Sequence, residues 1–149
     1  MISIRKRSTT KKKLAVDRIY PLDPADYEIH KQGYLIKSPP LKNGRRSNYF
    51  VFQSKYRKRY FIIHTNNTNS KIYFDYFCKH EDLKYPKGSI DLDQITKISY
   101  PVHIEGKNRL LIETENGSNR REYYLTSVNN DEDEMQSWIH HIKRFIQLN

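Results

Sequence analysis

The residues best suited to chemistry in this sequence are basic and lie close together in the chain. Residues 31–59 include nine Lys or Arg and not one Asp or Glu. Arg57 and Arg59 lie two positions apart, so in a strand their side chains share one face, whereas Lys58 points the other way. Lys37 ends the core-directed stripe of an earlier predicted strand and is expected at its rim. We therefore expect three cations to converge at one end of a sheet.

Such a group of cations suits a ligand that carries two or more phosphates. Arg offers planar, bidentate donors to phosphate, and Lys offers a compact charge. Each well-formed hydrogen bond to a charged group contributes about 1.5–3 kcal/mol. The alternative interpretation is a solvated basic strand face that binds nothing specific.

The composition restricts the broad class of protein. The 149 residues carry a formal net charge of +10, which favours polyanionic partners such as nucleic acid, an anionic membrane or an acidic protein. No stretch approaches the roughly 18 apolar residues that span a bilayer, and no signal-peptide core follows Met1. Cys78 is the only cysteine. This indicates a reducing, intracellular setting, and we expect Cys78 to lie buried or half-buried in a strand.

Residues for catalysis or metal binding are not arranged in a recognisable pattern. The histidines are scattered without HExxH spacing, and no glycine-rich phosphate loop occurs. His140 and His141 are adjacent on a predicted helix, where neighbouring side chains cannot both face one metal ion. We expect no enzymatic activity, no metal site and no cofactor.

Short strand patterns separated by turn signals must position the basic residues. Strands are predicted over residues 33–38, 56–64, 71–77, 88–92, 95–102, 109–114 and 122–126. The last two form a predicted hairpin around Asn116 and Gly117.

The C-terminal segment has a helical pattern instead. Apolar residues at three- and four-residue spacing, including Met135, Trp138 and Ile142, predict a helix over about residues 131–147. Asn130 or Asp131 can cap it. We interpret Trp138 as the structural anchor of this helix in the core. The expected fold is mainly β (α+β): a seven-stranded bent antiparallel sheet or partly open barrel, capped by one C-terminal α-helix.

The chain is expected to contain one domain with a basic extension. Residues 1–18 hold seven Lys or Arg and one acid, and we predict a disordered arm there. This arm either attracts anionic lipid or serves as a targeting signal or inert tail. Residues 19–31 are interpreted as a lead-in segment and residues 32–147 as the domain.

Several stretches in this order resemble the pleckstrin-homology (PH) domain family, over roughly residues 32–146. Residues 33–40 (Gly-Tyr-Leu-Ile-Lys-Ser-Pro-Pro) are similar to the opening strand of Gab/Dos-type docking adaptors. Residues 56–61 (Tyr-Arg-Lys-Arg-Tyr-Phe) resemble the family's second strand. Residues 87–92 (Lys-Gly-Ser-Ile-Asp-Leu) are similar to the fourth strand of Tec-type kinase PH domains, and residues 133–139 resemble the family's helix with its Trp.

This resemblance implies a binding site for phosphoinositide headgroups. By the family's pattern Lys37, Arg57 and Arg59 would hold the ring phosphates, and Lys87 would add a further contact. Secondary lipid contacts are assigned to Arg45, Arg46, Lys55, and Tyr73 or Tyr76. The implied function is recruitment of a signalling protein from the cytoplasm to the inner face of the plasma membrane, with 3-phosphorylated lipids such as phosphatidylinositol 3,4,5-trisphosphate as ligands. We expect a monomer.

The first predicted turn, residues 39–55, is longer than in the adaptors it resembles. Tyr49, Phe50 and Phe52 lie in this turn beside basic residues and could enter the membrane as an apolar tip. The alternative is an extended hairpin or a patch folded onto the barrel.

Two other functions are compatible with the sequence. The PH superfold can bind a protein or peptide partner by strand addition between the helix and a sheet edge, as in a signalling adaptor. Basic residues interleaved with Tyr and Phe can also bind nucleic acid. Nucleic acid is not favoured, because the cations gather at one strand pair and no nucleic-acid motif is present.

Overall fold

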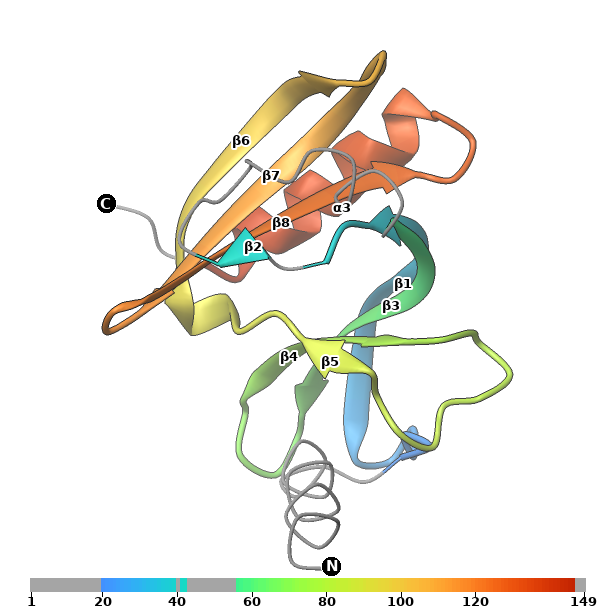
Figure 1. Ribbon diagram of the computed structural model, residues 1–149. Coiled ribbons are helices and arrows are strands. Elements are labelled where there is room, and N and C mark those ends of the chain that lie inside the picture. The colour runs from blue at the N-terminus through green and yellow to red at the C-terminus, as the bar shows by residue number, and fades with distance from the viewer. Residues whose placement is uncertain (1–19, 40, 43–55, 147–149) are drawn as a thin grey trace, which may run out of the picture. The chain divides into compact units, whose positions relative to one another are not determined.

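The computed structural model describes residues 20–39, 41–42 and 56–146, which form strands and one α-helix (Figure 1). In chain order the elements are β1 (Tyr27–Lys37), β2 (Leu41–Lys42), β3 (Arg57–Asn66), β4 (Ile72–Phe77), β5 (Gly88–Ser89), the 3₁₀-helix η1 (Leu92–Gln94), β6 (Ile95–Ile104), β7 (Lys107–Asn116), β8 (Asn119–Ser127) and α3 (Glu132–Arg144).

Seven of the strands follow one another in a single open antiparallel sheet. Their order is β5-β4-β3-β1-β8-β7-β6, and the two-residue strand β2 pairs with β8 outside this order. The sheet does not close, since β5 and β6 remain as its two ends. The predicted fold class, seven strands followed by one C-terminal helix, is confirmed.

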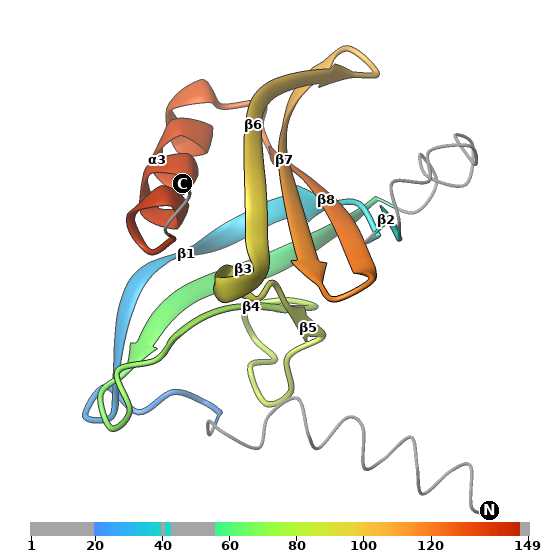
Figure 2. The same cartoon turned by 90° about the vertical axis from the view of Figure 1, so that its left-hand side faces the viewer.

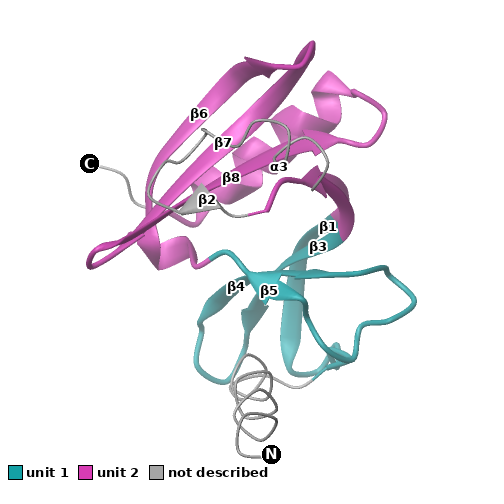
Figure 3. Ribbon diagram, in the orientation of Figure 1, with its two compact units in different colours: residues 1–32, 60–90 teal, residues 33–59, 91–149 magenta. Residues whose placement is uncertain are grey.

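The chain divides into two compact units (Figure 3). The first comprises Met1–Gln32 and Tyr60–Ile90, and the second comprises Gly33–Arg59 and Asp91–Asn149.

The first unit has an aromatic core between β3 and β4. Phe61 lies opposite Tyr76, and Ile63 lies opposite Phe74, in the antiparallel register. Phe61, Ile63 and Phe74 are fully buried, as expected for strand residues that face a core. The burial of these large side chains provides the main hydrophobic stabilisation of this unit.

A polar cluster is also buried in the first unit. His64 and Asp75 are fully buried, and the His64 Nε2 atom lies 3.0 Å from Asp75 Oδ2. The hydroxyls of Tyr20 and Ser89 both donate to the Asp75 carboxylate. These bonds satisfy a carboxylate that would be costly to bury alone.

The second unit contains the β6-β7-β8 meander and helix α3 (Figure 2). Gly117 occupies the turn between β7 and β8 with a φ of 61°, which glycine adopts without steric cost. Asn116 pairs with Asn119 across this turn, so the predicted hairpin is confirmed.

Helix α3 begins after Asp131, whose side chain accepts a hydrogen bond from the backbone N–H of Glu134. This bond satisfies one of the open donors of the first turn. The buried face of the helix presents Met135, Trp138 and Ile142. Across the parts of the chain that the structure describes, no helix is both long and apolar enough to cross a membrane.

Strands β6, β7 and β8 extend beyond their predicted bounds, the helix is shorter than predicted, and three further local predictions differ from the structure. Strand β1 begins at Tyr27 instead of residue 33, because Glu28 and Ile29 are both exposed and hide the alternation that marks a strand. Strand β5 ends at Ser89, and Leu92 belongs to η1. Cys78 is exposed, because it follows the end of β4 and enters the next bend.

Candidate functional site

Lys37 is the last residue of β1 and lies in the second unit. It pairs with Leu125 of β8, and its side chain is only 7% exposed. The Nζ atom donates a hydrogen bond to the Ser38 carbonyl at 2.8 Å and lies 5.8 Å from the centre of the Tyr123 ring. The sequence predicts Lys37 at the rim of the sheet, but the structure shows its side chain buried, with the ammonium group hydrogen-bonded to a backbone carbonyl.

Arg57 and Arg59 come from the start of β3, in the same unit. The Nη1 atom of Arg57 donates to the Tyr56 carbonyl at 3.0 Å, and that of Arg59 donates to the Lys58 carbonyl at 3.1 Å. Arg57 is exposed and Arg59 is half-buried. Each guanidinium has five N–H donors, and the carbonyl bond uses one nitrogen of the group.

The positive charge of Arg59 affects the pKa of Lys37. Burial, together with the positive charge of Arg59, lowers the pKa of Lys37 from 10.5 to about 8. Two cations from different strands therefore act in one region, and the charge of Arg59 disfavours the charged form of Lys37. An anion bound there would reverse this effect.

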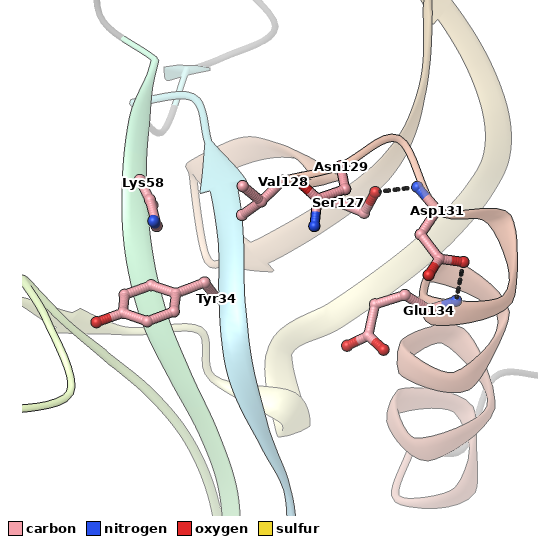
Figure 4. A pocket seen from close by; sticks show the side chains of 7 residues that line it. All are labelled: Tyr34, Lys58, Ser127, Val128, Asn129, Asp131 and Glu134. Atoms are coloured by element: carbon pink, nitrogen blue, oxygen red, sulfur yellow. Dashed lines mark hydrogen bonds between the residues drawn. The ribbon is translucent and has the colours of Figure 1, made fainter.

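Lys58 lies apart from this group. Its Nζ atom is 4.6 Å from the centre of the Tyr34 ring. Both side chains line a pocket of about 320 Å³, whose other wall comes from the β8-α3 connection and the helix start (Figure 4). The lining residues are Tyr34, Lys58, Ser127, Val128, Asn129, Asp131 and Glu134. Asp131 and Glu134 are already engaged in bonds to backbone and to the Trp138 indole.

Three of the predicted lipid contacts lie in the first unit. Lys87 is exposed, just before β5. Tyr73 is buried, and its ring stacks on His64 at 5.3 Å between centroids. Tyr76 is half-buried beside Phe61, so of the two tyrosines it is the more accessible to a ligand.

The remaining predicted contacts lie outside the described residues. These are the secondary contacts Arg45, Arg46 and Lys55 and the membrane-tip residues Tyr49, Phe50 and Phe52. Their roles stay predictions.

The comparison with known families agrees with this architecture. A family model for the PH domain matches residues 29–147, which is most of the chain. The chain belongs to the PH-domain family. No curated protein matches the sequence. The closer likeness to Gab/Dos-type adaptors and Tec-type kinases remains a prediction.

Membership of the PH family identifies a signalling module that binds lipids or proteins. PH domains are in general binding modules without catalysis. Within residues 20–39, 41–42 and 56–146 of this PH domain, no group of three or more His, Cys, Asp or Glu could hold a metal ion.

Two contacts in the site of this PH domain could not be expected from the sequence. Tyr123 lies beside the Lys37 ammonium, and the Ser38 carbonyl accepts its hydrogen bond. Strand β8 is some 85 positions further along the chain, and no local signal fixes its register with β1. The alternation within β8 does predict that Tyr123 and Leu125 share one face.

Proposed function

We propose that this PH domain binds phosphoinositide headgroups through Lys37, Arg57 and Arg59 and thereby docks a signalling protein on the inner face of the plasma membrane. The observation that carries the proposal is the burial of Lys37 within the field of Arg59. An anion bound there would be attracted by both positive charges at a site partly removed from water.

The side chains supply the donors that a phosphorylated ring requires. Arg57 and Arg59 can each present planar paired donors to a phosphate, and Lys37 adds a third cation from the neighbouring part of the sheet. Three separated cations match a ring with several phosphates better than a single phosphate. We infer a preference for 3-phosphorylated headgroups such as that of phosphatidylinositol 3,4,5-trisphosphate.

Lys87 and Tyr76 are proposed as additional lipid contacts on the first unit. Lys87 is exposed and free of burial cost, so it can approach a phosphate directly. Lys87→Ala is therefore expected to weaken headgroup binding by less than Lys37→Ala.

A vesicle sedimentation assay with single phosphoinositides tests the proposal. Lys37→Ala, Arg57→Ala and Arg59→Ala are each expected to lower affinity by about tenfold or more, since each removes at least one charge-assisted bond. Lys58→Ala is the matched control, because it removes the same charge from the same strand at the Tyr34 side. Its affinity should fall by about threefold or less.

Two results would contradict the proposal. Equal losses for all four variants would indicate diffuse attraction between a basic protein and an anionic surface. Binding to single-stranded oligonucleotides at physiological salt, with none to phosphoinositide vesicles, would indicate a nucleic-acid-binding protein.

A further inference from the structure

Tyr85 stands out among the apolar side chains of the described residues. It is 77% exposed, although most large apolar residues there are buried or half-buried. Only one other large apolar residue in this part of the chain counts as exposed, Ile29 at 43%. Tyr85 lies in the connection between β4 and β5, in the first unit.

The chain on either side of Tyr85 is fixed, so its exposure is a property of the fold. Pro86 is buried directly after it. The backbone N–H of Lys87 donates to the Tyr76 carbonyl at 2.7 Å. Gly88 packs so closely on Tyr76 that an added Cβ would lie 2.3 Å from the tyrosine oxygen. These contacts hold the segment in place and leave the ring of Tyr85 directed into solvent.

The immediate surroundings of Tyr85 are basic. Lys84 precedes it and Lys87 follows two positions later, and both side chains are exposed. The acidic residues of this connection come earlier, and Glu81 is paired with His80 at 3.3 Å. An exposed phenol ring is thus close in the chain to two exposed lysines.

We propose that Tyr85, Lys84 and Lys87 form a second membrane contact, in which the Tyr85 ring enters the headgroup region of an anionic bilayer and the two lysines contact lipid phosphates. Tyr carries an apolar ring and a polar hydroxyl, and such side chains concentrate at membrane–water interfaces. Neighbouring lysines add attraction to anionic lipids. This inference rests on the proposed membrane function and names a part of the surface that carries it.

A bilayer fits this surface better than a protein partner does. Protein interfaces concentrate their affinity in apolar anchors that are fully enclosed by surrounding contacts. Tyr85 is a single exposed ring with lysines at positions 84 and 87, and among the described residues no second large apolar side chain of this connection is exposed beside it. A lipid surface can surround a projecting ring without a complementary pocket.

Fluorescence of the variant Tyr85→Trp tests the contact directly. Trp138 is the only tryptophan and is fully buried, so its emission is a constant background that the unmodified chain measures. The probe is phosphatidylcholine vesicles that contain phosphatidylserine and phosphatidylinositol 3,4,5-trisphosphate. We expect the added emission to shift to shorter wavelength on these vesicles and to be quenched by brominated phosphatidylcholine.

Binding of Tyr85→Ser measures the contribution of the ring. Affinity for the same vesicles should fall by about fivefold, while affinity for soluble inositol 1,3,4,5-tetrakisphosphate should not change. Ile29→Ser is the control, since Ile29 is also exposed but its direct neighbours are Glu28 and His30. This control should leave vesicle binding unchanged.

The inference would be overturned if the Tyr85→Trp emission stayed unchanged on vesicles that the chain binds, or if Tyr85→Ser bound them as tightly as the unmodified chain. These failures differ from a failure of the proposed function, in which the unmodified chain would not bind the soluble inositol phosphate. An equal loss of vesicle affinity in Ile29→Ser would also overturn the inference, because it would reflect general apolar exposure.

Discussion

Lys37 has two properties that conflict in the folded chain. Its side chain is buried at the end of β1, yet it carries an ammonium group close to the positive charge of Arg59. The hydrogen bond to the Ser38 carbonyl offsets part of the cost of removing this charge from water. We expect this charge to weaken the fold, as residues in binding sites often do.

Substitution Lys37→Met should therefore make the domain more stable. Met keeps the apolar stem but removes the charge, and we expect the free energy of unfolding at neutral pH to rise by about 1–2 kcal/mol. Headgroup binding should be lost in the same variant. Chemical denaturation measures the first effect and titration with soluble inositol phosphate measures the second.

The exposed Lys97 of β6 provides the control, since Lys97→Met removes the same charge where no burial cost exists. Its stability should stay within about 0.5 kcal/mol of the unmodified chain. A clear loss of stability in Lys37→Met would mean that the ammonium group stabilises the fold, contrary to the proposal.

At the scale of residues, the sequence predicts a group of cations, but it does not predict the environment of each one. Strand alternation separated Lys58 from Arg57 and Arg59, and the structure places Lys58 against Tyr34. The burial of Lys37 depends on the pairing of β1 with β8 and on Tyr123, and local patterns do not fix such distant contacts.

At the scale of elements, turn signals and apolar spacing were sufficient for the strand order along the chain and for the helix. Asn116 and Gly117 marked the β7-β8 turn, and the Asp131 cap marked the helix start. The first part of β1 was missed, since its pairing with β3 is non-local and its side chains show no alternation.

The helix cap can be tested with Asp131→Ala. Loss of the hydrogen bond to the Glu134 N–H should lower the free energy of unfolding by about 1 kcal/mol. Asp133→Ala is the control, because Asp133 is also in the first turn but does not cap, and its effect should be about half as large or less. Thermal unfolding of the three proteins measures the difference, and equal effects would show that the cap bond contributes nothing of its own.

The close packing of β4 on β5 predicts a second stability effect. In Gly88→Ala the new Cβ would lie 2.3 Å from the Tyr76 oxygen, and we expect a loss of about 1–3 kcal/mol in the free energy of unfolding. The same substitution in a Tyr76→Ala background should cost much less, because the conflicting side chain is gone. A cost that is identical in both backgrounds would exclude this steric explanation.

At the scale of the whole molecule, we expect charge outside the proposed site to add to the attraction toward anionic surfaces. Residues 1–18 contribute seven basic residues and one acid, so their removal lowers the formal net charge from +10 to +4. We expect the shortened chain to lose most of its affinity for phosphatidylserine vesicles, and this loss should shrink as salt rises. Its affinity for soluble inositol phosphate should stay within about twofold of the full chain. A large loss of soluble headgroup affinity would assign residues 1–18 to the binding site.

Because the pKa of Lys37 is lowered, we expect the binding of a phosphate ligand and the binding of a proton by Lys37 to depend on each other. In the free protein Lys37 loses its proton as the pH rises above about 8, and a bound phosphate would raise its pKa again. Affinity should therefore be independent of this group below about pH 8 and should fall above it. The free energy of unfolding shows the opposite trend. Between pH 8 and 10.5 Lys37 binds more protons in the unfolded chain than in the folded chain, so its contribution to the free energy of unfolding rises with pH over that range.

Calorimetric titration with soluble inositol 1,3,4,5-tetrakisphosphate slightly above pH 8, in buffers of different ionisation enthalpy, tests the central claim most directly. At this pH the phosphates are largely ionised, so proton uptake on binding reports chiefly on Lys37. We predict uptake of a fraction of a proton by the unmodified chain and none by Lys37→Gln, whose binding should also be much weaker. Tight binding without proton uptake, or unchanged binding by Lys37→Gln, would contradict the assignment of Lys37 and Arg59 to the headgroup site.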